Sequence, residues 1–160
     1  TIGMRHTDSA RAIAATAIGG VMLLNLVGEH LLLARRLPDA VLIPGLLDFH
    51  HAWNRGVSFS LFWQDTDRGS LLLSLFLAAI VIVLGTMAWR AKDALSALGL
   101  GLIIGGALGN LSDRIAYRAV FDFLFLHLGR MPLFVCNIAD IPITLGALCL
   151  VGEAFKSQKP

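Results

Sequence analysis

The chain has 160 residues, of which 56% are hydrophobic and only 15% are charged. This composition excludes an ordinary soluble domain and indicates an integral membrane protein that forms one domain over residues 1–160. The net charge is only +2 and no basic run exceeds the pair Arg35-Arg36, so we expect no nucleic acid among its partners.

Four apolar runs divide the chain, and each is long enough to span a bilayer as a helix. They cover residues 12–34, 71–89, 94–111 and 138–155. Asn25 and Glu29 lie four residues apart in the first run, so they share one helix face, which must turn inward or lie near the interface. The sequence therefore predicts an all-α membrane protein with four transmembrane helices.

An even number of spans places both termini on one side of the membrane and the long connections, about 35–70 and 112–137, on the other. Basic residues are denser near the span ends on the side of the termini, so we expect cytoplasmic termini. The first long connection has alternating residues at 57–61 after a predicted turn, which indicates a small extracytoplasmic β element. For the second connection we expect a short loop or helix.

Six polar side chains stand among apolar runs between Gly106 and Leu145, where an ionisable group is costly and suggests a function. They are Asn110, Asp113, Arg114, Asp122, Asn137 and Asp140. Two common routes to peptide hydrolysis lack their motifs. No HExxH is present, and adjacent His50 and His51 in a predicted strand should point to opposite faces, so we expect no metal. Ser58 lacks the second glycine of a nucleophile elbow.

Asp122 and Asp140 fit a third route, in which two carboxylates share one proton and act as base and acid on a water molecule. Asp140 lies in the first turn of the last predicted helix, and the chain between the two acids can fold back through Gly129 and Pro132. Capping of that helix by Asn137, with Asp140 near its positive end, is an equal alternative on local sequence.

Asn110, Asp113 and Arg114 share one face as the third helix reaches the interface. They either close the helix end as a polar cluster or orient the carboxylates and the scissile amide. The local sequence favours neither alternative.

Three separated motifs, GALGNLSDR, VFDFLFLH and FVCNIADIPIT, resemble in order and spacing the bacterial lipoprotein signal peptidase family, signal peptidase II. WNRGVSFSLF is similar to the Asn-x-Gly-x-x-Phe segment in the first extracytoplasmic loop of that family. The resemblance implies an aspartyl dyad of Asp122 and Asp140. It also implies a set of supporting and substrate-positioning residues: Asn54, Gly56, Asn110, Asp113, Arg114 and Asn137.

The resemblance further implies no metal or organic cofactor and a prolipoprotein substrate, cut on the amino side of a Cys that bears a diacylglyceryl group. With the predicted topology, it implies a monomer in the inner membrane, in contact with membrane lipid, whose active site faces the extracytoplasmic side. In that family the first span usually carries an acidic residue and, four positions later, a Lys, where this chain has Asn25 and Glu29.

That departure leaves two readings open beside the lipoprotein peptidase, namely a specialised paralogue with a dedicated membrane substrate and an inactive substrate-binding relative. Retention of both acids argues against the second. A small transporter or channel subunit is the alternative from another class, but the acids gather near one interface rather than at the midplane. Glu29 has no basic partner within its own predicted helix, so we predict that Glu29→Gln is tolerated.

Overall fold

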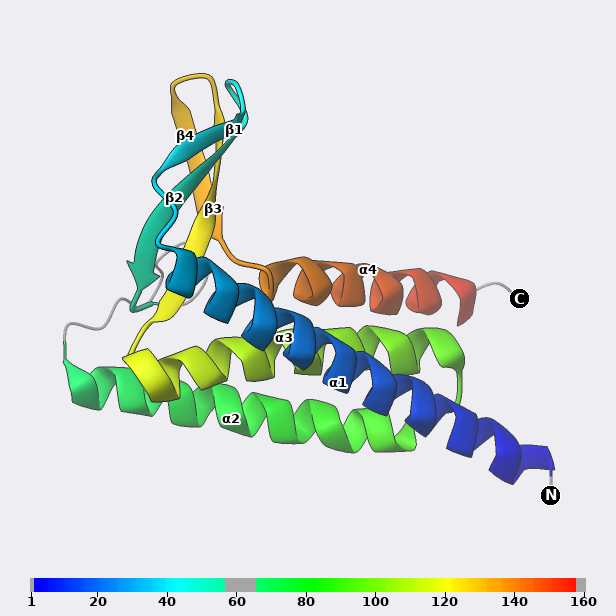
Figure 1. Ribbon diagram of the computed structural model, residues 1–160. Coiled ribbons are helices and arrows are strands. Elements are labelled where there is room, and N and C mark those ends of the chain that lie inside the picture. The colour runs from blue at the N-terminus through cyan, green and yellow to red at the C-terminus, as the bar shows by residue number, and fades with distance from the viewer. Residues whose placement is uncertain (1, 57–65, 158–160) are drawn as a thin grey trace.

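The computed structural model describes residues 2–56 and 66–157. Four helices make up most of it: α1 (Ile2–Arg35), α2 (Asp67–Arg90), α3 (Ala94–Tyr117) and α4 (Asp140–Ser157). Four strands form one antiparallel sheet in the order β1-β2-β3-β4: β1 (Ala40–Ile43), β2 (Leu47–Asn54), β3 (Val120–Leu128) and β4 (Met131–Cys136). The sheet stands at one end of the helices, while the start of α1 and the end of α4 lie at the other (Figure 1).

Three helices in the described part of the chain are long and apolar enough to cross a membrane, namely α1, α2 and α3. This confirms an integral membrane protein with mostly helical structure. Helix α4 has the predicted position, but its 18 residues include three charged side chains, Asp140, Glu153 and Lys156. A fourth membrane span therefore stays a prediction.

Side-chain caps explain where α2 and α3 begin. The hydroxyl of Thr66 accepts the Gly69 N–H at 3.1 Å, and the carboxylate of Asp93 accepts the Ser96 N–H at 2.7 Å. Each bond satisfies one of the free N–H groups of a first helical turn. Helix α3 continues six residues beyond the predicted end of its apolar run at residue 111, to Tyr117, so its polar C-terminal residues are part of the helix itself.

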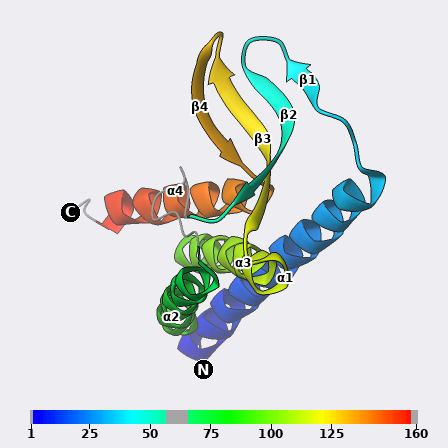
Figure 2. The same cartoon turned by 90° about the vertical axis from the view of Figure 1, so that its left-hand side faces the viewer.

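Glycines let α3 pack closely between α1 and α4, as the crossing ribbons in Figure 2 indicate. A Cβ at Gly99 would lie 2.9 Å from the Gly146 carbonyl oxygen on α4, and one at Gly101 would lie 2.7 Å from the Ala14 carbonyl oxygen on α1. Small residues allow helix backbones in a membrane to approach one another. The packing of α3 against both neighbours thus depends on the absence of side chains at these positions.

The sheet confirms that a small β element accompanies the mostly helical structure, and it corrects one prediction. The second long connection forms the hairpin β3–β4 rather than a loop or helix. The predicted strand at 57–61 lies outside the described residues, whereas β2 ends at Asn54 and pairs with β3 from Leu47↔Leu126 to Asn54↔Val120. Aromatic residues pack beneath this pair, with Phe121 and Phe123 on β3 buried against Phe49 on β2. Burial on the pleated surface favours strands for these aromatic residues.

The expectation that His50 and His51 point to opposite faces is also wrong. The register of β2 shifts between Phe49 and Ala52, so the alternation of side chains is interrupted there. Both imidazole rings reach the carboxylate of Asp39, with Nδ1–oxygen distances of 2.6 Å for His50 and 3.4 Å for His51.

Candidate active site

Asp122 lies on β3 at the end of the sheet nearest the helices, and it is 3% exposed. Two amides hold its carboxylate: Asn54 Nδ2 donates to Oδ2 at 2.9 Å, and Asn137 Nδ2 donates to Oδ1 at 3.1 Å. Asn54 reaches it because β2 and β3 pair across this position, where Ala52 is the register partner of Asp122.

Asp140 is the first residue of α4, and Asn137 caps that helix. The Asn137 side-chain oxygen accepts the N–H groups of Ala139 at 2.8 Å and of Asp140 at 3.2 Å. The Asn137 backbone N–H in turn donates to Asp140 Oδ2 at 3.2 Å, and Asn110 Nδ2 donates to Asp140 Oδ1 at 3.2 Å. Capping and participation in a polar site, which the sequence presented as alternatives, are therefore both satisfied by the same side chains.

One side chain connects the two acids. The Asn137 amide nitrogen donates to Asp122 Oδ1 and also to Asn110 Oδ1, the latter at 2.9 Å, while Asn110 donates to Asp140. Neutral amides thus bridge two carboxyl groups that come from different elements and are separated by 18 positions in the sequence. The structure brings Asp122 and Asp140 into one network, and their catalytic roles stay predictions.

The pKa of Asp122 is raised to about 7. Burial is the largest cause, because it disfavours the charged carboxylate, and the negative charge of Asp140 acts in the same direction. Hydrogen bonds from Asn54 and Asn137 and the charge of Arg114 lower the pKa but do not compensate. Near neutral pH the Asp122 carboxyl is therefore poised between its protonated and ionised forms.

Asp113 and Arg114 fix the surroundings of the acids without touching either. Asp113 Oδ2 accepts the Phe121 N–H at 3.0 Å, which holds the residue before Asp122. Arg114 Nη2 donates to the Gly56 carbonyl oxygen, and the Gly56 N–H donates to Asn54 Oδ1 at 2.9 Å. Both side chains are 3% exposed. The two residues connect α3 to the start of β3 and to the segment that follows β2.

An apolar groove of about 430 Å³, with Asp140 among its lining residues, lies between the sheet and α4. Its walls come from β1, β2, the turn that joins them, β3, β4 and the first turns of α4: Ile43, Leu46, Leu47, Leu124, Leu126, Phe134, Cys136, Ile141, Thr144 and Leu145. The sequence did not reveal this groove, because its residues are ordinary apolar ones that only the sheet brings together.

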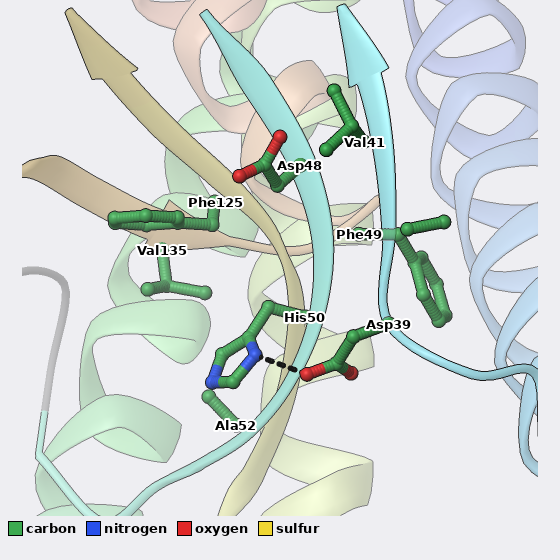
Figure 3. A pocket seen from close by; sticks show the side chains of 9 residues that line it. Asp39, Val41, Asp48, Phe49, His50, Ala52, Phe125 and Val135 are labelled. Carbon is green, nitrogen blue, oxygen red and sulfur yellow. Dashed lines mark hydrogen bonds and ion pairs between the residues drawn. The ribbon is translucent and has the colours of Figure 1, made fainter. Parts of the chain in front are cut away.

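A second hollow, of about 590 Å³, lies on the sheet and is lined by Asp39, His50 and seven other residues. Figure 3 shows the His50 ring turned toward Asp39. Neither Asp122 nor Asp140 lines it, so we do not assign it to the site. In the described part of the chain, no three His, Cys, Asp or Glu side chains are grouped to hold a metal ion. Ser58 lies outside the described residues.

Asn25 and Glu29 are buried beside the site, at 0% and 4% exposure, although the sequence did not include them among the site residues. Their four-residue spacing predicted a shared face, and the structure confirms that this face turns inward. Helical spacing alone does not predict which residue of another helix this face contacts.

Comparisons with known proteins agree with the arrangement. A family model described as "Signal peptidase (SPase) II" matches residues 13–156. A lipoprotein signal peptidase of Methylobacterium sp. (strain 4-46) is 40% identical over 146 residues, covering 90% of this chain and 88% of that protein. One from Methylorubrum extorquens (strain PA1) is 47% identical over 109 residues, and this match covers 68% of this chain and 64% of the relative.

Two solved structures share the fold. A bacterial membrane enzyme solved by the in meso method at 2.3 Å matches with a TM-score of 0.72 and 19% identity over 91% of both chains. Another, at 1.9 Å, matches with a TM-score of 0.64 and 19% identity over 93% of this chain and 94% of that one. The family match and the three apolar helices define the class of integral membrane peptidases. Within that class, the chain belongs to the signal peptidase II family.

Proposed function

We propose that this protein is an aspartic endopeptidase that removes the signal peptide of prolipoproteins, with Asp122 and Asp140 as its catalytic pair. The observation that carries the proposal is the amide network of Asn137 and Asn110, which joins two acids whose charges interact. The names of the related proteins, lipoprotein signal peptidases, give the substrate class.

The chemistry follows from two carboxyl groups that hold one proton between them. The ionised carboxylate takes a proton from a water molecule as its oxygen attacks the scissile carbonyl carbon, while the protonated carboxyl gives its proton to the carbonyl oxygen. Collapse of the tetrahedral intermediate breaks the C–N bond. The leaving amine takes a proton from the carboxyl that was protonated by water, while one hydroxyl of the intermediate returns its proton to the other carboxylate, so that the pair again holds one proton. Asn54, Asn110 and Asn137 keep both carboxyl groups oriented without adding charge.

The apolar groove supports a lipid-bearing substrate. Asp140 is one of its lining residues, so an acyl chain along Leu126, Phe134 and Leu145 could hold an attached Cys near that acid. Two acyl chains anchor a substrate in a leaflet far more stably than one chain does. We therefore propose that the substrate Cys carries a diacylglyceryl group and that cleavage occurs on its amino side.

The arrangement of the chain supports the proposed topology. The sheet lies at one end of the helices, and the start of α1 and the end of α4 lie at the other (Figure 1). Asp122 is on β3 of that sheet, and Asp140 begins α4 at the end opposite its C-terminus. The 18 residues of α4 give a length of about 27 Å at 1.5 Å per residue, close to a hydrocarbon core of about 30 Å. We propose that α4 is the fourth span, that the termini are cytoplasmic and that the acids face the extracytoplasmic side of the inner membrane.

Exposed apolar side chains at the tip of the sheet, such as Val41, Leu128 and Met131, suit contact with membrane lipid at that face. Every supporting residue that we name comes from a single chain. We therefore propose that a monomer, without a cofactor, is sufficient for activity.

The proposal is tested by cleavage assays with purified protein in detergent. Asp122→Asn and Asp140→Asn should each reduce kcat by about 10²- to 10⁴-fold, the range of general acid–base catalysis, while the protein stays folded. Asp39→Asn, which removes a carboxyl that directly precedes β1 and lies outside the network, is the matched control. Activity near that of the wild type in either dyad variant would refute the catalytic assignment.

The substrate is tested separately with one precursor in two forms, with and without the diacylglyceryl group on its Cys. We expect cleavage of the lipidated form and little or none of the unmodified one. Equal rates would remove the lipid from recognition but would leave the aspartyl chemistry intact.

A further inference from the structure

Helices α1 and α3 meet along a regular row of contacts. Three glycines of α3, spaced four residues apart, touch three residues of α1 with the same spacing. The facing pairs are Gly101 with Ala17, Gly105 with Val21, and Gly109 with Asn25. In each pair a Cβ on the glycine would lie 2.8 Å from a side-chain atom of its partner. Residue numbers rise together on the two helices, so the helices run parallel, and the next facing pair in the row is Asp113 with Glu29.

Burial and contact agree with this register. Glu29 is 4% exposed and Asp113 is 3% exposed. Of the neighbouring side chains, Asp113 has the largest effect on the Glu29 carboxyl, both through a hydrogen bond and through its charge. The other charged groups near the pair are Arg114 on α3 and Asp122 on β3. Two carboxyl groups from different helices are thus buried against each other beside the site.

Such a contact needs a proton. Ionised carboxylates only accept hydrogen bonds, and two like charges in a buried contact repel each other strongly. None of the ion pairs in the described part of the chain includes Glu29. The Arg114 guanidinium donates instead to the Gly56 carbonyl oxygen. Within the described residues no basic side chain forms an ion pair with Glu29, and the charge of Arg114 acts on Asp113 instead.

The position of the proton follows from what Asp113 already binds. Asp113 Oδ2 accepts the Phe121 N–H at 3.0 Å, a bond that favours the ionised form of Asp113. Glu29 accepts no such backbone bond in the described structure, and its Oε1 is buried without a hydrogen-bond partner there. The proton of the pair is therefore placed on Glu29.

We propose that Glu29 is a positioning residue which stays protonated and donates a hydrogen bond to Asp113, so that the Asp113 carboxylate fixes the start of β3 and with it Asp122. This inference rests on the proposed function for its consequence in catalysis. In this role Glu29 needs a hydrogen-bond donor but no negative charge.

Two substitutions of Glu29 separate the donor from the charge. Glu29→Gln keeps a donor of similar size and should retain kcat within about threefold of the wild type, whereas Glu29→Leu removes the donor. For Glu29→Leu we expect kcat to fall about 10- to 100-fold, because a displacement of the Asp122 carboxyl by up to about 1 Å has an effect of this size. KM should stay within about threefold, because no substrate contact is lost.

Matched controls come from Glu153 on α4, near the end of that helix opposite Asp140, where its carboxylate forms an ion pair with Lys156 at 4.0 Å. Glu153→Gln and Glu153→Leu should both leave kcat unchanged. A Glu29→Leu protein that keeps wild-type kcat, or a Glu29→Gln protein as impaired as Glu29→Leu, overturns the positioning role without touching the dyad assignment.

The proton itself is measured without any assay of activity. Infrared difference spectra of wild-type protein minus Glu29→Gln at neutral pH should contain the C=O stretching band of a protonated carboxylic acid, and spectra against Glu153→Gln should not. Absence of the band overturns the proposal even if Asp122 and Asp140 prove catalytic. Presence of the band supports a protonated Glu29 even if they do not.

Discussion

Asp122 on β3 and Asp39, which directly precedes β1, have opposite properties. Asp122 is 3% exposed, accepts hydrogen bonds from two neutral amides, and has a pKa raised to about 7. The Asp39 side chain is 56% exposed, and its pKa is lowered, first by the hydrogen bond with His50. The comparison shows that a polar partner alone does not determine the charge of an acid. At Asp122, burial next to a second acid raises the pKa more than two hydrogen bonds lower it. At the exposed Asp39, the hydrogen bonds to the imidazoles lower the pKa more than burial raises it.

The largest expected effect that tests this comparison is on stability. The folded pKa of Asp122 lies above its unfolded value of about 4, so its stabilising contribution is present below pH 4 and is lost as the pH rises through about 7. Asp122→Asn removes this loss, so the free energy of unfolding of the variant should exceed that of the wild type by about 4 kcal/mol above pH 7 but not at pH 4. Thermal unfolding in detergent across that range measures it. A difference that is constant with pH would contradict the raised pKa.

A second substitution perturbs the helices that position the acids. A Cβ at Gly106 would collide with the Ala139 carbonyl oxygen at the start of α4. Gly106→Ala should therefore cost about 1–3 kcal/mol, the usual range for overpacking, and reduce kcat through Asp140. Gly85→Ala on α2 is the control, since a Cβ there meets nothing within 4 Å. Equal Tm values for the two variants would show that the α3–α4 contact can relax.

The pKa of Asp122 can also be moved through a neighbour. The Asn54 amide lowers that pKa, so Asn54→Ala should raise it further, by about one unit for the loss of one hydrogen bond to a charged group. If the shared proton is required, the alkaline limb of the pH–kcat profile should move to higher pH. The Asp39→Asn variant provides the reference profile, and identical limbs would show that Asp122 does not set the limb.

The smallest effect is expected at Asp39. Its lowered pKa means that its contribution to stability is present above its unfolded pKa and is lost as the pH falls through the folded value. Asp39→Asn should leave kcat unchanged and lower Tm slightly at neutral pH, with the difference vanishing in acid. A marked loss of cleavage would indicate that the outer cluster acts on the site.

The helices were predictable from the sequence, because each is a long apolar run whose end is marked by charge or a cap. The clustering of Asn110, Asp113 and Arg114 on one face also followed from helical spacing alone. The assignment of the dyad needed the family resemblance, since local sequence around Asp140 was equally consistent with capping.

The sheet was not predictable in the same way. β3 reads as a continuous apolar run interrupted by Asp122, without the alternation that identifies a strand, and its partner β2 lies some 70 positions earlier. The bulge that turns His50 and His51 to one carboxylate leaves no sequence signal. Glu29→Gln is still predicted to be tolerated, but the reason has changed. The first reason was the lack of a basic partner within its own helix, whereas the structure indicates that Glu29 faces Asp113 on α3.

The pairing of β2 with β3 also has a consequence for the order in which the protein is made. β2 is synthesised before α2 and α3, whereas β3 follows both helices. The edge of β2 that accepts β3 must therefore wait, unpaired, while two further helices enter the membrane. Asp140 is synthesised later still, at the start of the last helix. A ribosome-bound chain thus lacks the pair of acids until residue 140 has been translated, so on the proposed catalytic assignment a shorter nascent chain cannot act on precursors that are being inserted beside it.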